Sequence, residues 1–398
     1  MTNEPLCLSE YGHGSFDLAD SVARKLARST RGILEVSPEP DGGQWKITAT
    51  NYVGTLNAAG LQVLIRPKIN LANLLVLLDL GIPATAWQEG DFAYRSRPDL
   101  LRAFVAFFAR SLEELSAHGL HRSYQREQDR LLALRGRIDF AAQIKKAFLP
   151  APIACVFDEY TADIAENRYL LGVANQLLRL GSIDPNTRAV LLHASSRFED
   201  VTPILPTAAD IDRLTLTRLN QHYRPTLQLA RLVVENLTIS DETGAYTAGS
   251  FLLDMNKVFE GYVTRRLRAA LRSRLQVCDQ THRCLGVGGK VPIYPDLEFR
   301  RHDEVVFVGD VKYKVAPSGK ARTDDYFQLL AYCTVLGLSH GVLIYAQVDD
   351  GDTAPDHNIE VVTGGQRLTT YRLNLAGTAA GIEASVAQLA DWIDRNAN

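Results

Sequence analysis

The spacing of apolar residues along the first part of the chain predicts a small α+β unit. Apolar residues recur at helical intervals between residues 17 and 31, and Gly32 follows as a helix stop. Apolar and polar residues then alternate from Trp45, and the apolar stretch Leu61 to Ile65 follows across a turn that contains glycine. We therefore expect one helix and one β-hairpin here. The polar side of the helix carries four cations, Arg24, Lys25, Arg28 and Arg31.

Longer helical patterns dominate the middle of the chain. Residues 97 to 119 repeat apolar positions at helical spacing and end in a His-Gly signal for a helix terminus. Further patterns predict helices over residues 161–180, 184–198 and 210–235, the second with Asp184 as N-cap and Pro185 at its first position. We expect a mainly α-helical region that is interrupted only by Leu134-Arg135-Gly136-Arg137-Ile138.

The pattern changes again after a turn-rich stretch, residues 240–250, which we interpret as an inter-domain loop. The predicted order is then a helix over 254–275, strands over 291–299 and 305–315, a helix over 323–336, a strand over 341–346, strands near Ile359 and Tyr371, and a helix over 382–396. This order is typical of a mixed α/β domain. We expect three domains, over residues 1–90, 91–239 and 251–398.

Composition narrows the class of protein. The 398 residues fit two or three domains at roughly 150 residues each. A net charge of -3 excludes an all-over basic coat, and 46% hydrophobic with 22% charged residues is typical of globular chains. No apolar run approaches the roughly 20 residues of a membrane span, and the amino terminus has no signal-peptide pattern. We expect a cytoplasmic protein with no membrane association.

The five cysteines are odd in number and widely spaced, which fits a reduced intracellular protein. Cys278, His282 and Cys284 lie close together in sequence, but no second Cys/His pair completes a tetrahedral metal site. Ordinary packing is therefore the favoured interpretation of these three residues.

Candidate chemistry lies on the two predicted strands that flank a charged turn. Paired residue numbers in an antiparallel hairpin have a constant sum, and pairing Asp296 with Asp310 centres the turn on Asp303, within the charged residues. Because strand side chains alternate, Asp310, Lys312 and Lys314 share one face. Two carboxylates across neighbouring strands suit a hard cation such as Mg²⁺, and a nearby lysine suits phosphodiester hydrolysis. Taken alone, an Asp-x-Lys strand is more often a solvated face.

Two predicted helices add polar candidates to this region. Glu260 lies at the margin of an apolar stripe that should face the sheet, and it is either a further metal-side carboxylate or a surface residue. Gln328 and Tyr332 are four residues apart and share one helix side. They are either supporting residues for the site or ordinary residues at a core boundary.

These parts occur in a recognisable order. The series Glu260, Tyr294-Pro295-Asp296, Asp310-Val311-Lys312 and Gln328 with Tyr332 resembles the PD-(D/E)xK nuclease superfamily. More narrowly, residues 251–263 resemble the entry to the nuclease domain of the McrC family, nuclease subunits of McrBC-type modification-dependent restriction systems. Further stretches that look like this family are Tyr52-Val53-Gly54, Ile65-Arg66-Pro67-Lys68-Ile69, residues 134–138 and residues 157–168. The likeness extends from about Tyr52 to Tyr345.

The resemblance implies a fold, an activity and partners. It implies a PD-(D/E)xK nuclease domain, with a central mixed sheet, that cleaves double-stranded, modified DNA with Mg²⁺ or Mn²⁺. Asp296, Asp310 and Glu260 would hold the metal, and Lys312 would orient or activate water. The partner would be an McrB-type AAA+ GTPase hexamer, stimulated by an amino-terminal docking domain. Because cutting both strands needs two active sites, we expect two such assemblies to dimerise. The chain itself has no phosphate-binding loop for a nucleotide.

Two other functions stay open on the sequence. One is a non-catalytic adaptor that regulates an AAA+ partner, although the intact Asp296, Asp310 and Lys312 speak against it. The other is an iron–sulfur RecB-like exonuclease, which needs four suitably spaced cysteines that the chain lacks.

Charge is uneven along the chain. Residues 261–323 hold 13 Lys and Arg against 6 Asp and Glu, a local excess of +7 that leaves -10 for the remainder. Part of the excess follows Glu260 along one helix, where it would attract DNA phosphates or form a solvated face. The DNA-binding candidates are Arg265, Arg272 and Lys314.

Overall fold

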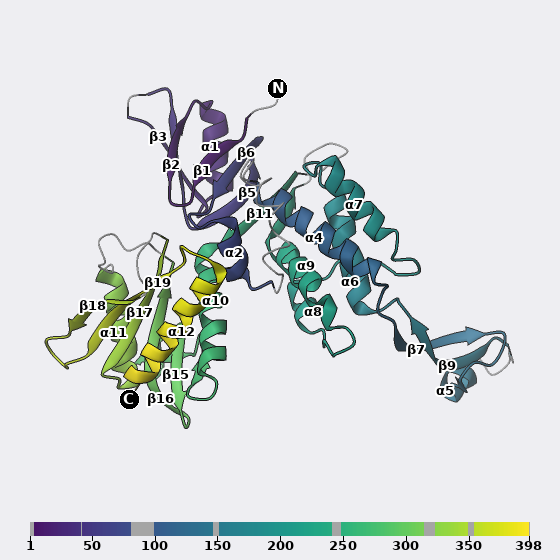
Figure 1. Ribbon diagram of the computed structural model, residues 1–398. Helices are drawn as coiled ribbons and strands as arrows, with labels where there is room; N and C mark the ends of the chain where they lie inside the picture. The colour runs from purple at the N-terminus through teal and green to yellow at the C-terminus, as the bar shows by residue number, and fades with distance from the viewer. Residues whose placement is uncertain are drawn as a thin grey trace. The chain divides into compact units, whose positions relative to one another are not determined.

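The computed structural model describes residues 4–40, 42–80, 99–145, 151–240, 248–313, 323–348 and 354–397. The chain forms two compact units, Met1–Leu80 with Leu252–Asn398, and Gly81–Phe251. In Figure 1 the first unit comprises the purple and the green-to-yellow ends of the chain. The finer three-domain division stays a prediction. We call residues 4–80 the amino-terminal lobe and residues 252–397 the carboxy-terminal lobe.

The amino-terminal lobe is a small α+β structure, as the pattern predicts, but it contains further strands and a second helix beyond the one helix and one hairpin expected. Its elements are β1 (Leu6–Ser9), β2 (His13–Phe16), α1 (Asp20–Ser29), β3 (Leu34–Pro38), β4 (Trp45–Ala49), β5 (Tyr52–Ala58), β6 (Leu61–Arg66) and α2 (Leu71–Leu78). Strands β2, β4 and β3 form one antiparallel sheet, and β6 pairs with β5 and β1. The expected hairpin is confirmed as β5–β6, whose strands pair antiparallel across Ala59 and Gly60, with φ of 55° and 77°. The strand pattern that begins at Trp45 is divided, however, because Trp45–Ala49 is β4 in the other sheet.

The carboxy-terminal lobe is built on a mixed six-stranded sheet. Its elements are α10 (Met255–Leu271), β12 (Gln276–Cys278), β13 (Arg283–Gly286), β14 (Lys290–Ile293), β15 (Leu297–Arg301), β16 (Glu304–Lys312), α11 (Thr323–Leu336), β17 (His340–Gln347), β18 (Ala354–Glu360), β19 (Arg367–Asn374) and α12 (Ala379–Asn396). The strand order is β12-β15-β16-β17-β19-β18, with β16, β17 and β19 parallel. The predicted order is confirmed from β16 to α12, but strands β12 and β13, which follow α10, were not predicted.

Helices cover both faces of this sheet (Figure 1). Val308 on β16 packs with Leu329 and Cys333 of α11. Its neighbour Phe307 contacts Trp392 of α12, with ring centroids 6.0 Å apart. Adjacent strand residues point to opposite faces, so α11 covers one face and α12 the other.

Hydrogen bonds join the two lobes within the first unit. The Asn51 side-chain amide donates to Asp254 Oδ1 at 2.6 Å, and Asp254 is the N-cap of α10. The Asn73 amide of α2 donates to the Leu375 carbonyl at 2.8 Å, and Asn73 is buried. Residues from the two ends of the sequence therefore share one packed unit.

Two segments near the carboxy-terminal lobe differ from their predictions. Residues 248–250 are not loop, because they open strand β11 (Ala248–Asp254), which pairs antiparallel with β10 (Leu237–Ser240); residues 241–247 lie outside the described residues. The strand expected over 291–299 is divided into β14 and β15. Pro295 lies between the two and has no backbone N–H to donate to a ladder.

The second unit is mainly helical. Its elements include α4 (Leu100–Ala117), α6 (Ala165–Leu178), α7 (Pro185–Ser195), α8 (Ala208–Asp212), the 3₁₀ helix η2 (Gln221–Tyr223) and α9 (Arg224–Asn236). The predicted N-cap Asp184 accepts a hydrogen bond from Thr187 N. The prediction of a single helix over 210–235 is wrong. The Asn220 side chain accepts a hydrogen bond from Thr217 N in a turn, and a new helix, α9, begins with Pro225 in its first turn.

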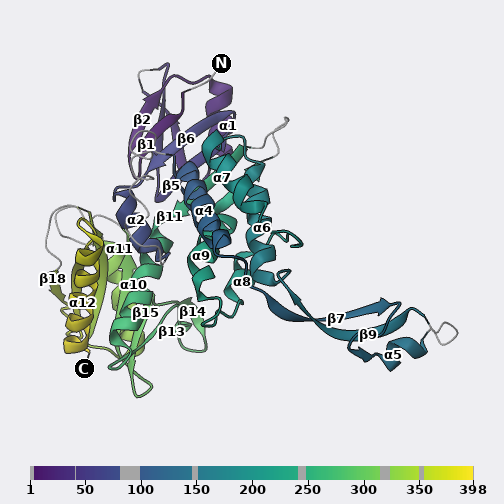
Figure 2. The same cartoon turned by 45° about the vertical axis from the view of Figure 1, so that its right-hand side comes forward.

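A β-sheet arm also belongs to the second unit, so the expectation of only one short interruption is wrong. The arm consists of β7 (Ser123–Leu131), β8 (Arg137–Ile138), α5 (Phe140–Ile144) and β9 (Ile153–Thr161), with β9 between the other strands. In Figure 2 it projects from the helices of its unit. Gly136 has φ +67°, and a Cβ there would lie 2.4 Å from the Val156 carbonyl oxygen. The glycine between the two arginines is therefore required by backbone approach.

No helix within the described ranges is long and apolar enough to span a lipid bilayer.

Candidate functional site

The hairpin that should carry the site has the predicted register. Leu297 pairs with Gly309 and Phe299 with Phe307, which are the pairings that a turn centred on Asp303 requires. A bulge after Phe299 shifts the last pairs by one residue. His302 and Asp303 turn the chain with φ of 48° and 68°, as a two-residue hairpin turn needs. Asp296 and Asp310 are the next residues beyond the Leu297–Gly309 pair.

Asp310 is a carboxylate with no exposed surface in the middle of the sheet. Its Oδ2 lies 2.8 Å from the Lys312 ammonium nitrogen. Its Oδ1 is buried and has no hydrogen-bond partner among the described residues. Burial, followed by the negative charge of Asp296, raises the pKa of Asp310 above its usual range. An additional positive charge would stabilise the ionised form of this residue.

The Asp296 carboxylate is held against the backbone of β16, the strand that carries Asp310. Its Oδ2 accepts a hydrogen bond from Val311 N at 2.9 Å, and its Oδ1 accepts one from the Gln280 amide at 3.2 Å. Val311 follows Asp310 directly, so the strand itself fixes the Asp296 carboxylate beside Asp310. The two carboxylates that the sequence places across the hairpin are therefore close enough to influence each other's charge.

Glu260 approaches the same carboxylates from α10. The stripe beside it faces inward as predicted, because Phe259 and Val263 are fully buried. Gln280 Nε2 donates to Glu260 Oε1 at 2.8 Å and so connects this residue with Asp296. Burial and then the charge of Asp296 raise the pKa of Glu260. Gln280 itself, with φ +48°, belongs to no motif, and sequence reasoning missed it.

Lys312 shares a face with Asp310, as strand alternation predicts, and its side chain is 18% exposed. Burial lowers the pKa of the Lys312 ammonium, but the charge of Asp310, the hydrogen bond to it and the charge of Asp296 together outweigh burial, and the pKa is raised. Asp325 on α11 adds a further, weaker negative charge. Asp325 is buried and accepts a hydrogen bond from the Tyr345 hydroxyl. Asp325 lies in the first turn of α11, where acidic residues are common, so the sequence did not indicate that it belongs to the site.

Gln328 and Tyr332 form the predicted pair on one side of α11. Gln328 Nε2 donates to the Tyr332 hydroxyl oxygen at 2.6 Å, and this hydroxyl donates to the Tyr294 carbonyl at 3.1 Å. Burial raises the pKa of Tyr332 to about 12, so its hydroxyl keeps its proton at neutral pH. The pair therefore holds the backbone two residues before Asp296.

A buried ion-pair cluster supports the other end of this segment. Glu298 is fully buried and accepts two hydrogen bonds from Arg283, both at 2.8 Å, and one from Arg300 at 3.0 Å. Although burial raises the pKa of Glu298, these hydrogen bonds outweigh it and the pKa is lowered. The strand that follows Asp296 is thus fixed by two arginines.

Most of the predicted cationic side of α10 is already paired with carboxylates. Arg265 lies 3.6 Å from Asp79 and donates to the Leu77 carbonyl at 3.2 Å. The ion pairs of its neighbours are Arg266 with Asp79 and Glu383, Arg268 with Asp279, and Arg274 with Asp391 and Asp394. Arg272 is exposed and has no ion-pair partner in the described part of the chain. Lys314 lies outside the described residues.

The carboxylates do not form a ready-made metal cage. Within the described ranges, no group of three or more His, Cys, Asp or Glu side chains is spaced to hold a metal ion. The Gln280 amide donates hydrogen bonds to both Glu260 and Asp296, and the Lys312 ammonium forms an ion pair with Asp310. The chemistry of Asp296 and Asp310 nevertheless fits a hard divalent cation, because both offer oxygen ligands and a buried Asp310 oxygen lacks a partner.

Comparisons with known proteins place this geometry in context. The family model described as "McrBC 5-methylcytosine restriction system component" matches residues 47–346. No curated protein matches the chain. Among solved structures, a chain from a refined half-complex of the tetradecameric assembly of Thermococcus gammatolerans McrB AAA+ hexamers with bound McrC is 20% identical, with a TM-score of 0.62; the match covers 98% of this chain and 100% of that one. At this identity the likeness concerns the fold.

A second solved structure, the Thermococcus gammatolerans McrBC complex determined by cryo-EM, is also similar. Its matching chain is 24% identical with a TM-score of 0.46, and the match covers 67% of this chain and 88% of that one.

Proposed function

Because the chain belongs to the family of McrBC 5-methylcytosine restriction system components, we propose that it is the DNA-cleaving subunit of such a system. The observation that carries the proposal is the fully buried Asp310, whose Oδ1 lacks a partner beside Asp296 and Lys312. Isolated burial of a carboxylate costs several kcal/mol, on the order of what a bound cation or ion pair returns. These residues support a PD-(D/E)xK site in which the Asp310 carboxylate would hold a metal ion.

Each residue has a definable task in phosphodiester hydrolysis. Asp296 and Asp310 would hold Mg²⁺ or Mn²⁺, with Glu260 beside them. When bound, the metal lowers the pKa of water and neutralises charge that develops on the phosphate. The Lys312 ammonium, which keeps its proton because of Asp310, donates hydrogen bonds to the attacking water or to a phosphate oxygen. Tyr332 and Gln328 act as positioning residues, because they hold the backbone before Asp296.

We also propose that the chain works with an AAA+ GTPase hexamer of McrB type and stimulates its GTP hydrolysis. A structural neighbour comes from an assembly of McrB AAA+ hexamers with bound McrC. On this proposal the motor supplies recognition of modified DNA, and two motor–nuclease assemblies dimerise to cut both strands.

The arm of the second unit is a better docking candidate than the amino-terminal lobe. Large apolar side chains are exposed along it, namely Tyr124, Leu132, Leu134, Phe140, Ile144 and Tyr160. Of the large apolar side chains described between residues 4 and 80, Tyr11 alone is exposed, and at 38% it is less exposed than any of these. Exposed apolar clusters on a projecting element are typical of a protein-binding surface.

A cleavage assay tests the proposed activity. The chain is combined with its cognate motor, GTP, Mg²⁺ and modified duplex DNA, and Asp310→Ala is compared with the parent. We expect Asp310→Ala to lose cleavage and to keep GTPase stimulation. The matched control is Asp303→Asn, which removes an equal charge at the hairpin turn, keeps a residue that tolerates the positive φ there, and should cut normally.

Parental cleavage by Asp310→Ala would contradict the site assignment. If the parent itself stimulates the motor and does not cut under any of these conditions, the alternative function of a non-catalytic regulatory adaptor is the correct one.

A further inference from the structure

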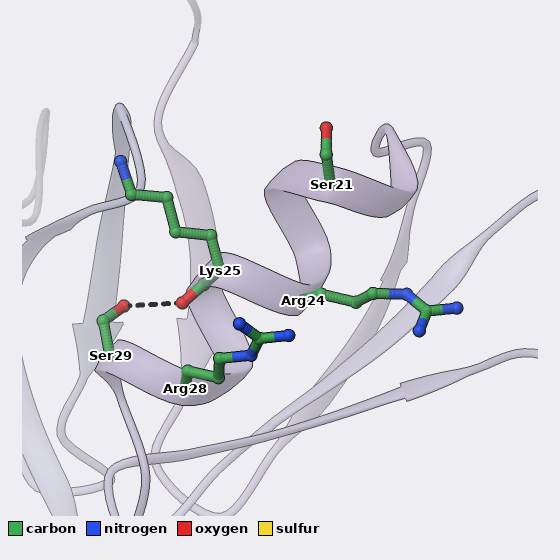
Figure 3. Close-up of a pocket in the computed structure, with 5 residues that line it drawn as sticks. All are labelled: Ser21, Arg24, Lys25, Arg28 and Ser29. Atoms are coloured by element: carbon green, nitrogen blue, oxygen red, sulfur yellow. Dashed lines mark hydrogen bonds between the residues drawn. The ribbon is translucent and has the colours of Figure 1, made fainter.

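The outer side of α1 in the amino-terminal lobe gathers cations that the proposed reaction does not use. Arg24, Lys25 and Arg28 lie between Ser21 and Ser29, and these five residues line a hollow of about 420 Å³ (Figure 3). Residues three and four apart share one side of a helix, so Arg28 neighbours both Arg24 and Lys25 and the three form a row, in which the Arg24 and Lys25 side chains extend in different directions (Figure 3). We call these five residues the α1 cationic side.

The opposite side of α1 fixes this row on a folded surface. Ala23 and Leu26 have no exposed surface, and Leu26 packs into the core with Leu34 and Ile47. Thr30 follows the helix, is fully buried and donates to the Leu26 carbonyl at 2.8 Å. The cations are therefore presented by an anchored helix and not by a loose tail.

These cations have little internal compensation. Arg24 approaches Asp20 at 3.9 Å, and both side chains are more than two thirds exposed. Over the residues that the structure covers, neither Lys25 nor Arg28 has an ion-pair partner. Surface pairs of this kind contribute about 0–1 kcal/mol, so a stronger external anion displaces Asp20 easily.

The shape and chemistry of the row select a class of ligand. From Ser21 to Ser29 the helix rises by about 12 Å, which is longer than a single phosphate group. None of the five lining side chains is aromatic, which argues against stacking on single-stranded bases, and none is apolar, which argues against a protein interface. Cations with serine hydroxyls are typical of contacts to a nucleic-acid backbone.

We propose that the α1 cationic side binds the phosphodiester backbone of duplex DNA without reading its sequence. The binding surface lies on a different lobe from Asp296 and Asp310. The inference rests on the proposed function in one respect, namely that duplex DNA is the substrate. Its role is to hold DNA, whereas the carboxylates and Lys312 cut it.

Salt dependence of DNA binding tests the inference. Anisotropy of a labelled duplex is measured with the full chain, without Mg²⁺, for the parent and for the triple variant Arg24→Gln, Lys25→Gln, Arg28→Gln. Each phosphate contact contributes about 0.9 to the slope of log K against log salt. We expect the triple variant to reduce this slope by about 2 to 3 and to weaken binding more than tenfold at low salt.

Two matched variants separate local contacts from total charge. The variant Arg213→Gln, Arg218→Gln, Arg224→Gln removes the same charge from exposed positions of the second unit and should keep the parental slope. The variant Arg24→Lys, Arg28→Lys keeps the charges and should also keep the slope. Both expectations follow from contacts made at α1.

Several results would overturn the inference. These are a parental slope in the α1 triple variant, an equal loss in the second-unit variant, and displacement of DNA by inorganic phosphate at constant ionic strength. Normal DNA binding with lost motor association would show that the surface serves an acidic protein instead. Asp310→Ala should keep the parental slope, so a failure of the endonuclease proposal would be seen separately in the cleavage assay.

Discussion

The two arginine-rich helices of the first unit, α10 and α1, treat their charges in opposite ways. On α10, Arg266 reaches Asp79 at 3.1 Å and Glu383 at 3.0 Å, and just after the helix Arg274 reaches Asp391 at 2.9 Å. On α1, the one ion-pair partner among the residues that the structure describes is Asp20, at 3.9 Å from Arg24. The sequence has its largest local excess of basic residues in the segment that includes α10. In the structure, however, the cations of α1 are the ones available to bind an external anion.

The difference shows that pairing, and not the count of charges, distinguishes a structural cation from a binding cation. The α10 arginines hold together elements that frame Glu260, so they serve the site indirectly. Within the described residues, Asp20 is the ion-pair partner of the α1 cations, and it lies on the same helix. We therefore assign chemistry and its support to the region around α10, and substrate retention to α1.

The largest expected effect separates the two regions by activity. Lys312→Ala should lower the maximum cleavage rate by about 100-fold or more, because a donor aimed at developing charge is lost. DNA affinity and its salt slope should change much less than in the α1 triple variant, since the three α1 cations are intact and at most one phosphate contact is lost. Lys290→Ala, which removes an exposed lysine of the nearby strand β14, is the control and should cut normally. Rapid cleavage by Lys312→Ala would remove this residue from the site.

The next largest expected effect is a change in the free energy of unfolding with pH. It depends on the different environments of two buried acids, Glu298 and Glu10. Glu298 is paired with arginines and has a lowered pKa, whereas burial raises the pKa of Glu10 to about 7. Glu10 accepts hydrogen bonds from Lys68 N at 3.2 Å and from the Tyr313 hydroxyl at 3.3 Å. Since the folded pKa lies above the usual 4.5, folding favours the protonated acid. As the pH rises from about 4.5 to about 7, the free energy of unfolding should therefore fall, by up to about 3 kcal/mol.

Glu10→Gln tests this contrast, because the amide oxygen still accepts both hydrogen bonds and carries no charge. Denaturant unfolding at several pH values should show that this variant lacks the fall and is more stable than the parent at pH 8. Parallel curves for the parent and Glu10→Gln from pH 4 to pH 8 would rule out the buried ionisable state.

A smaller effect is expected at the positioning pair on α11. Tyr332→Phe removes the hydrogen bond to the Tyr294 carbonyl and should slow cleavage about tenfold through a looser Asp296, an effect near 1.4 kcal/mol. The half-saturating Mg²⁺ concentration should rise in the same assay. An unchanged Mg²⁺ dependence would show that the tyrosine does not act through Asp296.

The smallest effect compares the two helices directly. Arg266→Gln leaves Asp79 and Glu383 without this partner and should lower the free energy of unfolding by about 1 kcal/mol. Lys25→Gln on α1 should change it by less than about 0.5 kcal/mol. Chemical denaturation of both variants measures the difference, and equal losses would show that the α1 cations are structural as well.

The sequence predicted those parts of the site that depend on local pattern. The hairpin register followed from the turn position, and the shared face of Asp310 and Lys312 followed from strand alternation. Contacts between distant residues could not be predicted in this way. Asp79 and Arg266 are 187 residues apart, and no periodicity connects them. Gln280 likewise depends on how its loop returns to Glu260.

The arm shows a different limit of pattern reasoning. Strand β7 has the sequence SYQREQDRL, which is polar on both faces, so neither alternation nor helical spacing is present. Such a strand forms because β9 pairs with it along its whole length, from Ser123 with Thr161 to Leu131 with Ile153. Long-range pairing here overrides a weak local signal.

The most direct test of the division between cutting and holding is the cleavage rate as a function of DNA concentration, measured with motor, GTP and Mg²⁺. The triple variant of Arg24, Lys25 and Arg28 should need more DNA for half-maximal rate and still reach the parental maximum. Asp310→Ala should fail to cut at every DNA concentration. A parental maximum rate in Asp310→Ala would contradict the account.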